Sequence, residues 1–393
     1  MRDTPPETAA REALLGRGRM LARQERWRSL AEALREADLS RSRTPGGTPA
    51  ACLLCEGAVQ DAMTRAAEAV ARGDPGAART AVLGFAGPLG PTTEAPWHAL
   101  LAAAAHLAAA RLWHAADAGR LPAPHCLAAE REHMDTAHLI LRPHDPSALG
   151  SAALAAARCA TLAALPWPEA RVAGAYEVLI AAEPGCPDHL RAYGLDLAPG
   201  RFGTWPELDR AARRIAMLTG DPRRLGGYAW VWLDVLARHP EGFAHVEAEL
   251  FVAGLHDILR AWPEEAPDQH LANLFAAWCA ARLAEETAPS AARARIGNCL
   301  GWIVTDQLRE IHPALWTCPG AADAGLGADG AARAQAVLAD LFAHQLARGR
   351  RVIFTAAGVT LQPGGCASCT LAPCAALAYP RRNLRDEDPP CLT

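Results

Sequence analysis

The most informative absence in this chain of 393 residues is lysine, because all 39 of its basic residues are arginine. Without lysine the chain cannot form a phosphate-binding loop of the Walker type, the ATP-pairing lysine of a kinase or a Schiff base with pyridoxal phosphate. Serine is also scarce: the chain has seven, and none lies in a Gly-x-Ser-x-Gly nucleophile turn. These absences leave metal chemistry as the main route by which the chain could catalyse a reaction.

A strong charge of one sign and a long apolar segment are missing as well. The net charge of −4 argues against nucleic acid or an anionic membrane as the main partner. The longest apolar run, residues 100–110, contains His106 and is too short to span a bilayer. No basic region followed by an apolar segment stands at the N-terminus, so we expect a cytoplasmic protein. In that reducing compartment, the 12 cysteines are expected to be thiols or metal ligands.

Alanine is the most abundant residue, with 90 copies, and it is the best helix former. Apolar residues recur at steps of three and four along most of the chain, which predicts amphipathic helices. Proline or glycine separates each predicted helix from the next. The predicted helices cover residues 8–37, 49–72, 97–118, 123–141, 146–164, 168–183, 187–196, 206–218, 222–238, 241–261, 267–286, 289–309 and 330–348, with a further one starting at residue 75.

Helix, short loop and helix repeated in this way predict an all-α fold of stacked antiparallel helix pairs, an α-solenoid. The tripeptide Trp-Pro-Glu begins at Trp167, Trp205 and Trp262, with spacings of 38 and 57 residues. A period near 38 lies within the range of two-helix repeats, and each proline is expected to open a helix. Chance is the alternative explanation, since all three residue types are common in this chain.

The C-terminal part of the chain has a different pattern. Residues 351–355 and 359–361 are rich in β-branched residues and flank Gly358, which predicts a small β-hairpin followed by a Cys-rich tail. The predicted organisation is therefore an N-terminal helical region (1–90), a helical-repeat domain (91–350) and a hairpin with its tail (351–393).

One region carries a resemblance to known proteins. The residues that carry it are Ala-Tyr-Glu-Val-Leu-Ile-Ala-Ala-Glu-Pro-Gly (175–185), Asp-His-Leu (188–190) and Leu-Ala-Pro-Gly-Arg-Phe-Gly (197–203). With them, the region from about 166 to 240 resembles bacterial tetratricopeptide-like helical-repeat proteins. The step from Tyr176 to Pro184 matches the second helix of such repeats, whereas Leu179 stands where they have a small residue. The resemblance implies a helical-repeat (TPR-like) fold and a protein-binding role, and it carries over no catalytic residue.

The strongest candidate site is a cluster of tail cysteines: Cys366, Cys369, Cys374 and Cys391. The Cys-x-x-Cys pair lets two thiolates converge on one ion, and four thiolates suit tetrahedral zinc. An iron–sulfur cluster could use the same ligands, and thiols without a metal are the other alternative. Cys391 is the weakest member, because two prolines and a charged run separate it from the rest.

A second Cys-x-x-Cys pair, Cys52 and Cys55, falls in a predicted helix, where residues three apart share a face. It could complete a site with Cys366 and Cys369, or it could act as a redox pair with a lowered pKa. Two small residues that face the core are the commoner case.

Histidines and acidic residues share helix faces in several places. Such pairs can bind metals in helix bundles, but a solvated or core-facing helix surface is the commoner origin of each pattern. The groups are Glu130 with His133, Asp135 with His138, the set His245, Glu249 and His256, and the row His98, His106 and His114. Trp230 and Trp232, two positions apart on one predicted helix, cannot share a face, so we expect one of them to leave the core and line a groove.

These features together predict a cytoplasmic helical-repeat scaffold or adaptor that binds a protein or peptide partner in a groove, with a structural zinc in its Cys-rich tail. Two alternatives stay open. One is an all-α metalloenzyme with His/Glu or Cys ligands in a biosynthetic pathway, and the other is a regulator that senses thiols or metals.

Overall fold

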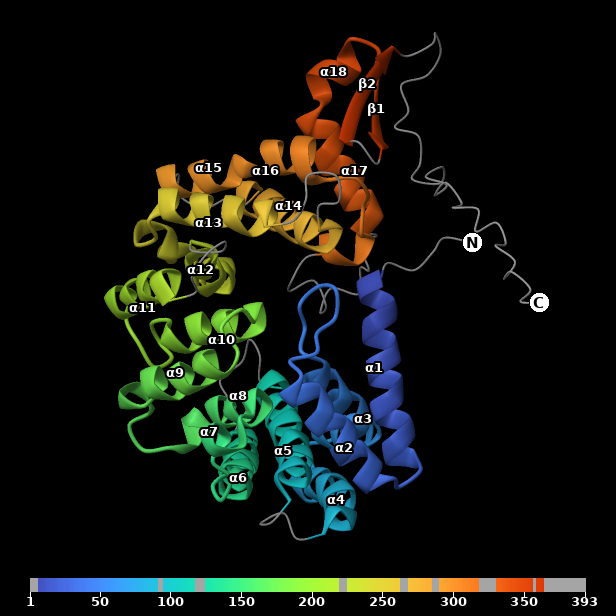
Figure 1. The fold of residues 1–393 in the computed structure, drawn as a ribbon, viewed down its shortest axis with the longest axis vertical. Helices are drawn as coiled ribbons and strands as arrows, with labels where there is room; N and C mark the ends of the chain where they lie inside the picture. Colours follow the sequence, from blue (N-terminus) through green and yellow to red (C-terminus); the bar gives the residue numbers. More distant parts are fainter. Residues whose placement is uncertain are drawn as a thin grey trace, which may run out of the picture. The chain divides into compact units, whose positions relative to one another are not determined.

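Most of the chain is α-helical in the computed structural model, as predicted, and one β-hairpin follows the helices (Figure 1). The structure describes residues 6–90, 95–116, 124–218, 225–261, 268–284, 290–317, 330–355 and 358–363. The chain divides into two units: unit 1 comprises residues 1–262 and 282–299, and unit 2 comprises 263–281 and 300–393. The boundaries predicted at residues 90 and 350 stay predictions.

The helices begin or end at proline, glycine or capping residues in most cases. Up to residue 299 they are α1 (Pro6–Arg23), α2 (Trp27–Leu39), α3 (Ala50–Ala71), α4 (Pro75–Ala86), α5 (Pro96–Ala116), α6 (Pro124–Leu141), α7 (Pro146–Leu149), α8 (Ala152–Ala160), α9 (Val172–Ala182), α10 (Pro187–Leu197), α11 (Trp205–Leu218), α12 (Gly226–Arg238), α13 (Ala248–Arg260), α14 (Gln269–Leu283) and α15 (Ala291–Gly297). Next come α16 (Cys299–Trp302), α17 (Gly330–Leu341), α18 (Ala343–Ala347), β1 (Arg350–Thr355) and β2 (Gly358–Pro363).

Four of the predicted helices, those expected over residues 8–37, 146–164, 289–309 and 330–348, are each broken into shorter α-helices. The single helix expected over residues 8–37 is α1 and α2, because Glu25 adopts a left-handed conformation with φ of 53° and turns the chain. No proline or glycine marks this break, which falls in the polar run of residues 23–26. The helix expected over 146–164 is broken at Gly150, where φ is 60° and the hydroxyl of Ser151 caps α8.

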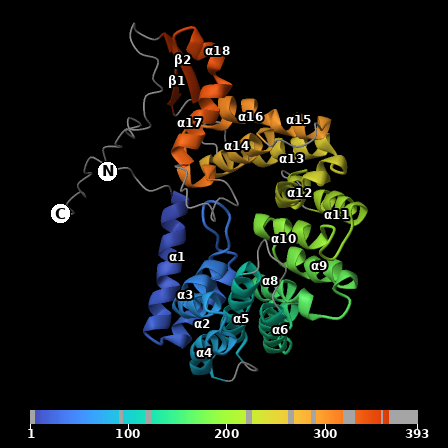
Figure 2. The same cartoon turned by 180° about the vertical axis from the view of Figure 1, so that it is seen from behind.

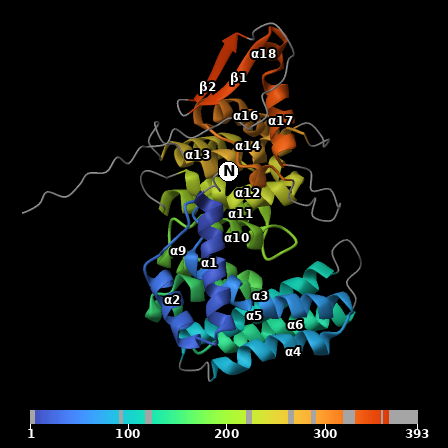
Figure 3. The same cartoon turned by 90° about the vertical axis from the view of Figure 1, so that its right-hand side faces the viewer.

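Alanine-rich helices pack closely in unit 1. The helices α3, α4, α5 and α6 lie side by side and enclose an apolar core (Figure 3). Helix α1 packs on α3, where a Cβ atom on Gly18 would lie 2.2 Å from the carbonyl oxygen of Leu54. Further along the chain, α9 contacts both α8 and α10 (Figure 2), and α12 packs against α10, α11 and α13. Small residues, glycine as well as alanine, therefore permit close contact between helices.

The contact between α10 and α12 makes a prediction about Gly194. A Cβ atom at this position would lie 1.8 Å from the carbonyl oxygen of Val231, so Gly194→Ala must push two helix backbones apart. We expect a loss of about 2 kcal/mol in the free energy of unfolding, measured by denaturant titration. The matched control is Gly174→Ala on α9, where nothing lies within 4 Å of the added Cβ atom. The free energy of unfolding of that variant should rise by about 0.5–1 kcal/mol, because alanine favours the helix more than glycine does. A similar change in both variants would contradict the close contact between α10 and α12.

In unit 2, one buried amide organises the segment after the π-helix Ile303–Gln307. The side-chain oxygen of Asn273 accepts hydrogen bonds from the backbone N–H of His312 (2.8 Å) and the indole N–H of Trp316 (2.9 Å). Its amide nitrogen donates to the carbonyl oxygen of Glu310 at 2.9 Å. Asn273 therefore holds a loop that has little regular structure of its own.

The predicted hairpin is confirmed. Strands β1 and β2 pair in antiparallel fashion, with Val352 opposite Leu361 and Ile353 opposite Thr360. Within the described ranges, every helix is too short or too polar to cross a lipid bilayer.

Candidate functional site

The four tail cysteines predicted to bind zinc, Cys366, Cys369, Cys374 and Cys391, lie outside the described residues. A zinc ion or an iron–sulfur cluster at these positions stays a prediction. The glutamate, cysteine and histidine side chains of the described ranges therefore supply the candidate sites below.

The two members of the second Cys-x-x-Cys pair have different surroundings on α3. Cys52 is exposed at the edge of a small pocket, whereas Cys55 is buried in the core of unit 1. Burial raises the pKa of the Cys55 thiol well above its usual range, and the neighbouring Cys52 acts in the same direction. A redox pair requires a lowered pKa, so the structure supports a core role for Cys55.

The predicted helix-face groups do not converge on common points. His133 contacts His106 through their Nδ1 atoms at 3.0 Å, whereas Glu130 lies 3.3 Å from His114. His138 lies 3.5 Å from the hydroxyl of Thr161.

The third group is also dispersed over different partners. The ring of His245 stacks on Trp205 with 5.1 Å between the ring centres, and Glu249 forms an ion pair with Arg295 at 2.7 Å. Each of these contacts is an ordinary packing or surface interaction.

The expectation that Trp230 or Trp232 leaves the core is wrong. Both indole side chains are buried, and so is Tyr228 on the same helix. The reason is that α10, α11 and α13 all pack on α12, so the faces that carry Trp230 and Trp232 are both covered. A helix that is surrounded by others can bury aromatic residues two positions apart, because opposite faces of it meet apolar neighbours.

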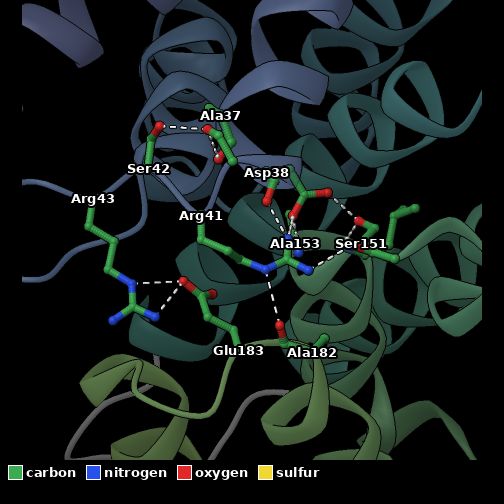
Figure 4. Close-up of polar contacts among 12 residues, drawn as sticks. Ala37, Asp38, Arg41, Ser42, Arg43, Ser151, Ala153, Ala182 and Glu183 are labelled. Carbon is green, nitrogen blue, oxygen red and sulfur yellow. Dashed lines mark hydrogen bonds and ion pairs between the residues drawn. The ribbon is translucent and has the colours of Figure 1, made fainter.

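The most organised polar region of unit 1 lies where the loop between α2 and α3 meets α8 and the turn between α9 and α10 (Figure 4). Asp38, at the end of α2, is buried and accepts hydrogen bonds from the hydroxyl of Ser151 and from the backbone N–H of Ala153 (2.9 Å). Both donors lie at the beginning of α8, where backbone N–H groups lack partners inside the helix. Asp38 thereby fixes the start of α8 on α2.

Two arginines of the loop extend this connection to the α9–α10 turn. Arg41 has a left-handed backbone, with φ of 54°, and its guanidinium donates to the carbonyl oxygens of Ala182 (3.0 Å) and Gly150 (2.7 Å). Arg43 donates through Nε to Oε1 of Glu183 at 2.8 Å (Figure 4). A strained backbone at Arg41 persists because its side chain satisfies helix-end carbonyl groups.

Glu183 is the centre of this region. Only 4% of its surface is exposed, and its second oxygen, Oε2, lies 2.8 Å from Nε2 of His189. Burial acts to raise the pKa of this carboxyl, but the hydrogen bonds from His189 and Arg43 outweigh burial and hold the pKa below its usual value. Glu183 is therefore an ionised carboxylate with a fixed orientation.

Cys186 joins Glu183 and His189 in a buried cluster. One ligand atom from each of the three side chains lies within 4.8 Å of the ligand atoms of the other two, and all three residues are buried. Burial, followed by the charge of Glu183, raises the pKa of the Cys186 thiol to about 12, although the nearby backbone N–H of His189 acts in the opposite direction. We name these residues the Glu–Cys–His cluster.

A small pocket borders this cluster. It is lined by Asp38, Arg41, Cys52, Ala153, Glu183 and His189, among others. The pocket has room for about one water molecule. Two of the three cluster residues are therefore accessible to water or to a small ion.

The sequence contains a signal for this cluster, Glu183-x-x-Cys186-x-x-His189, that was not used to predict it. The spacing crosses the end of α9 and the beginning of α10, so no single helix face contains all three residues. Pro184, Gly185 and Pro187 form the turn that brings them together. A search for ligands along helix faces therefore misses the cluster.

No protein-family model, curated protein or solved structure matches this chain. Its fold and its site define the class instead: a mostly α-helical protein with a small β-hairpin and a buried Glu–Cys–His cluster between two helices.

Proposed function

We propose that the chain is a helical-repeat scaffold, related in architecture to tetratricopeptide-like solenoids, which binds a protein or peptide partner in a concave groove. One observation carries this proposal. Several helices of unit 1 contact both the next helix and the one after it, as α3 contacts α4 and α5, and α10 contacts α12. Stacked helix pairs produce this contact pattern, and their typical activity is to bind other proteins. A cytoplasmic location and a zinc ion at the tail cysteines belong to the same proposal.

Trp167 is the side chain that fits a role in partner binding. It is 73% exposed, and its backbone is left-handed with φ of 50°, between Pro166 and Pro168. An exposed tryptophan on a rigid segment is a typical energetic centre of a protein interface. The second Trp-Pro-Glu copy differs, because Trp205 starts α11 and stacks on Trp232 at 6.0 Å. These two copies therefore occupy different structural positions and do not support a repeat unit.

The proposal predicts the behaviour of the Trp167→Ser variant. Loss of an interface tryptophan costs about 2 kcal/mol or more, so the dissociation constant for the partner should rise at least about 30-fold. The immobilised wild-type chain is used to capture a partner from its source cells. Calorimetry then measures the dissociation constant of that partner for the wild type and for Trp167→Ser. The stability of Trp167→Ser should stay within about 0.5 kcal/mol of the wild type, because the side chain is exposed.

Leu83→Ser is the matched control, since Leu83 is an exposed apolar residue on α4, outside the region of resemblance. It should leave the affinity unchanged. Capture of the same proteins by the wild type, by Trp167→Ser and by an unrelated helical protein would contradict the scaffold proposal.

A metal-dependent function is the second candidate, and the Glu–Cys–His cluster is the observation that favours it. Its three side-chain types are the ligands of many zinc sites. Whether the ion would serve catalysis, sensing or structure depends first on whether the cluster binds one.

A further inference from the structure

We propose that Glu183, Cys186 and His189 bind one zinc ion at the turn between α9 and α10. Its three ligands do not include the tail cysteines, and the proposal does not depend on the scaffold function.

The donor set suits zinc chemically. Zinc is held by thiolate, imidazole and carboxylate ligands, and sites that keep a position for water or substrate use three protein ligands. Magnesium and calcium prefer sets made of oxygen alone, which a thiol does not provide. One thiol, one imidazole and one carboxylate in a cluster therefore favour zinc over the common hard cations.

The arrangement of the side chains also suits an ion. The ligand atoms of all three residues already lie within 4.8 Å of one another, with Glu183 and Cys186 in the turn after α9 and His189 in the first turns of α10. Zinc bonds of about 2.0–2.3 Å place tetrahedral ligand atoms about 3.3–3.7 Å apart. The 2.8 Å between Oε2 of Glu183 and Nε2 of His189 needs to widen by only about half an ångström.

The surroundings of Glu183 leave one of its oxygens available to the ion. Arg43 binds Oε1 through Nε (2.8 Å) and Nη2 (2.7 Å), so the carboxylate is oriented by one oxygen and presents Oε2 to His189. Hydrogen bonds of this kind from outside the ligand shell fix the orientation of metal ligands in known sites. The adjacent pocket, which Glu183 and His189 help to line, provides an entry path and room for a water molecule as the fourth ligand.

The competing role of the cluster is a metal-free clamp, in which Glu183 joins Arg43 to His189 by hydrogen bonds alone. The clamp explains the burial of Glu183 and His189, but it requires nothing of Cys186. The zinc site and the clamp therefore differ most clearly in what they predict for Cys186.

The test uses the full chain, with all four tail cysteines replaced by serine in one background so that tail zinc does not contribute. The protein is loaded with cobalt(II) or zinc and washed, and its metal content and its visible absorption are measured. We expect about one metal per chain and, with cobalt, the thiolate charge-transfer absorption that a Cys–Co bond produces.

Cys186→Ser and His189→Gln, made in that same background, should each lose the bound metal, and Cys186→Ser should lose the charge-transfer band. Serine suits position 186 because this residue is the N-cap of α10, and glutamine at 189 keeps an N–H donor for Glu183. Circular dichroism of the metal-free variants confirms that they fold. Cys159→Ser, at another buried cysteine, is the matched control and should keep the metal.

No metal in the tail-cysteine variant, or metal that remains in folded Cys186→Ser and His189→Gln, would overturn the proposal. Loss of zinc only when the tail cysteines are replaced would overturn it as well. None of these outcomes bears on partner binding, so failure of this proposal and failure of the scaffold function are distinguishable.

Discussion

Replacement of Asn273 by leucine is expected to destabilise the loop 308–317 of unit 2 by about 4 kcal/mol. Asn273 is fully buried, and its side-chain oxygen accepts from the N–H of His312 and the indole N–H of Trp316, both of them buried residues. Leucine has a similar volume but no acceptor. Two buried donors then lose their partner, and each costs about 1–3 kcal/mol.

Hydrogen exchange followed by mass spectrometry measures this effect locally. Because each 1.4 kcal/mol corresponds to a factor of ten, amides in residues 308–317 should exchange up to about 1,000-fold faster in Asn273→Leu. The matched control is Asn298→Leu, at an exposed position after α15, which should change local stability by less than about 0.5 kcal/mol. Equal exchange rates in the wild type and in Asn273→Leu would show that the amide does not hold this loop.

Acid should weaken the packing of α5 against α6 through a buried histidine pair. His106 and His133 are each less than 5% exposed, and their Nδ1 atoms lie 3.0 Å apart. Burial, followed by the positive charge that a protonated His133 would carry, lowers the pKa of His106 to about 4, and burial also lowers the pKa of His133. Both rings are therefore neutral in the folded chain at neutral pH.

The sign of the pH dependence follows from these pKa values. An unfolded histidine has a pKa near 6.5, so below that pH the unfolded chain binds protons that the folded chain excludes. The contribution of His106 to stability is complete above about pH 6.5 and is lost as the pH falls towards 4, by up to about 3 kcal/mol. Urea unfolding at a series of pH values from 7 to 4 measures this loss.

In the double variant His106→Leu/His133→Leu, the free energy of unfolding should change less between pH 7 and pH 4, because both titrating rings are gone. Replacing both residues together also avoids a single buried imidazole with no hydrogen-bond partner. His114→Leu is the control: His114 lies on the same helix, and its side chain is 77% exposed. If the free energy of unfolding of the double variant falls with pH as steeply as that of the wild type, other groups cause the loss of stability in acid.

The local features of the fold follow from the sequence more readily than its contacts do. The β-hairpin was predicted because β-branched residues on both sides of Gly358 leave few alternatives. The break at Glu25 was missed because the left-handed residue that ends a helix is usually glycine, whereas here Glu25 takes that role and the backbone N–H of Arg26 donates to the carbonyl oxygen of Leu21 at 3.0 Å. Trp230 and Trp232 were misplaced for a similar reason: their burial depends on how many helices surround α12.

The contacts around the Glu–Cys–His cluster could not be predicted from the sequence either. Its three residues are close in sequence, but Arg43, which orients Glu183, and Cys52, which lines the pocket, come from a distant part of the chain. The loop that carries Arg41 and Arg43 lies between two helices that were predicted, over residues 8–37 and 49–72. Periodicity alone does not reveal that this loop would satisfy the carbonyl groups of Ala182 and Gly150.

Hydrogen exchange of the chain with and without a captured partner tests the scaffold proposal most directly. If the helical-repeat region binds the partner, protection should increase in the segment around Trp167 and in helices α9 to α11, and should decline to the unbound level in Trp167→Ser. Protection that stays unchanged throughout residues 160–240 when the partner is bound would contradict the proposal.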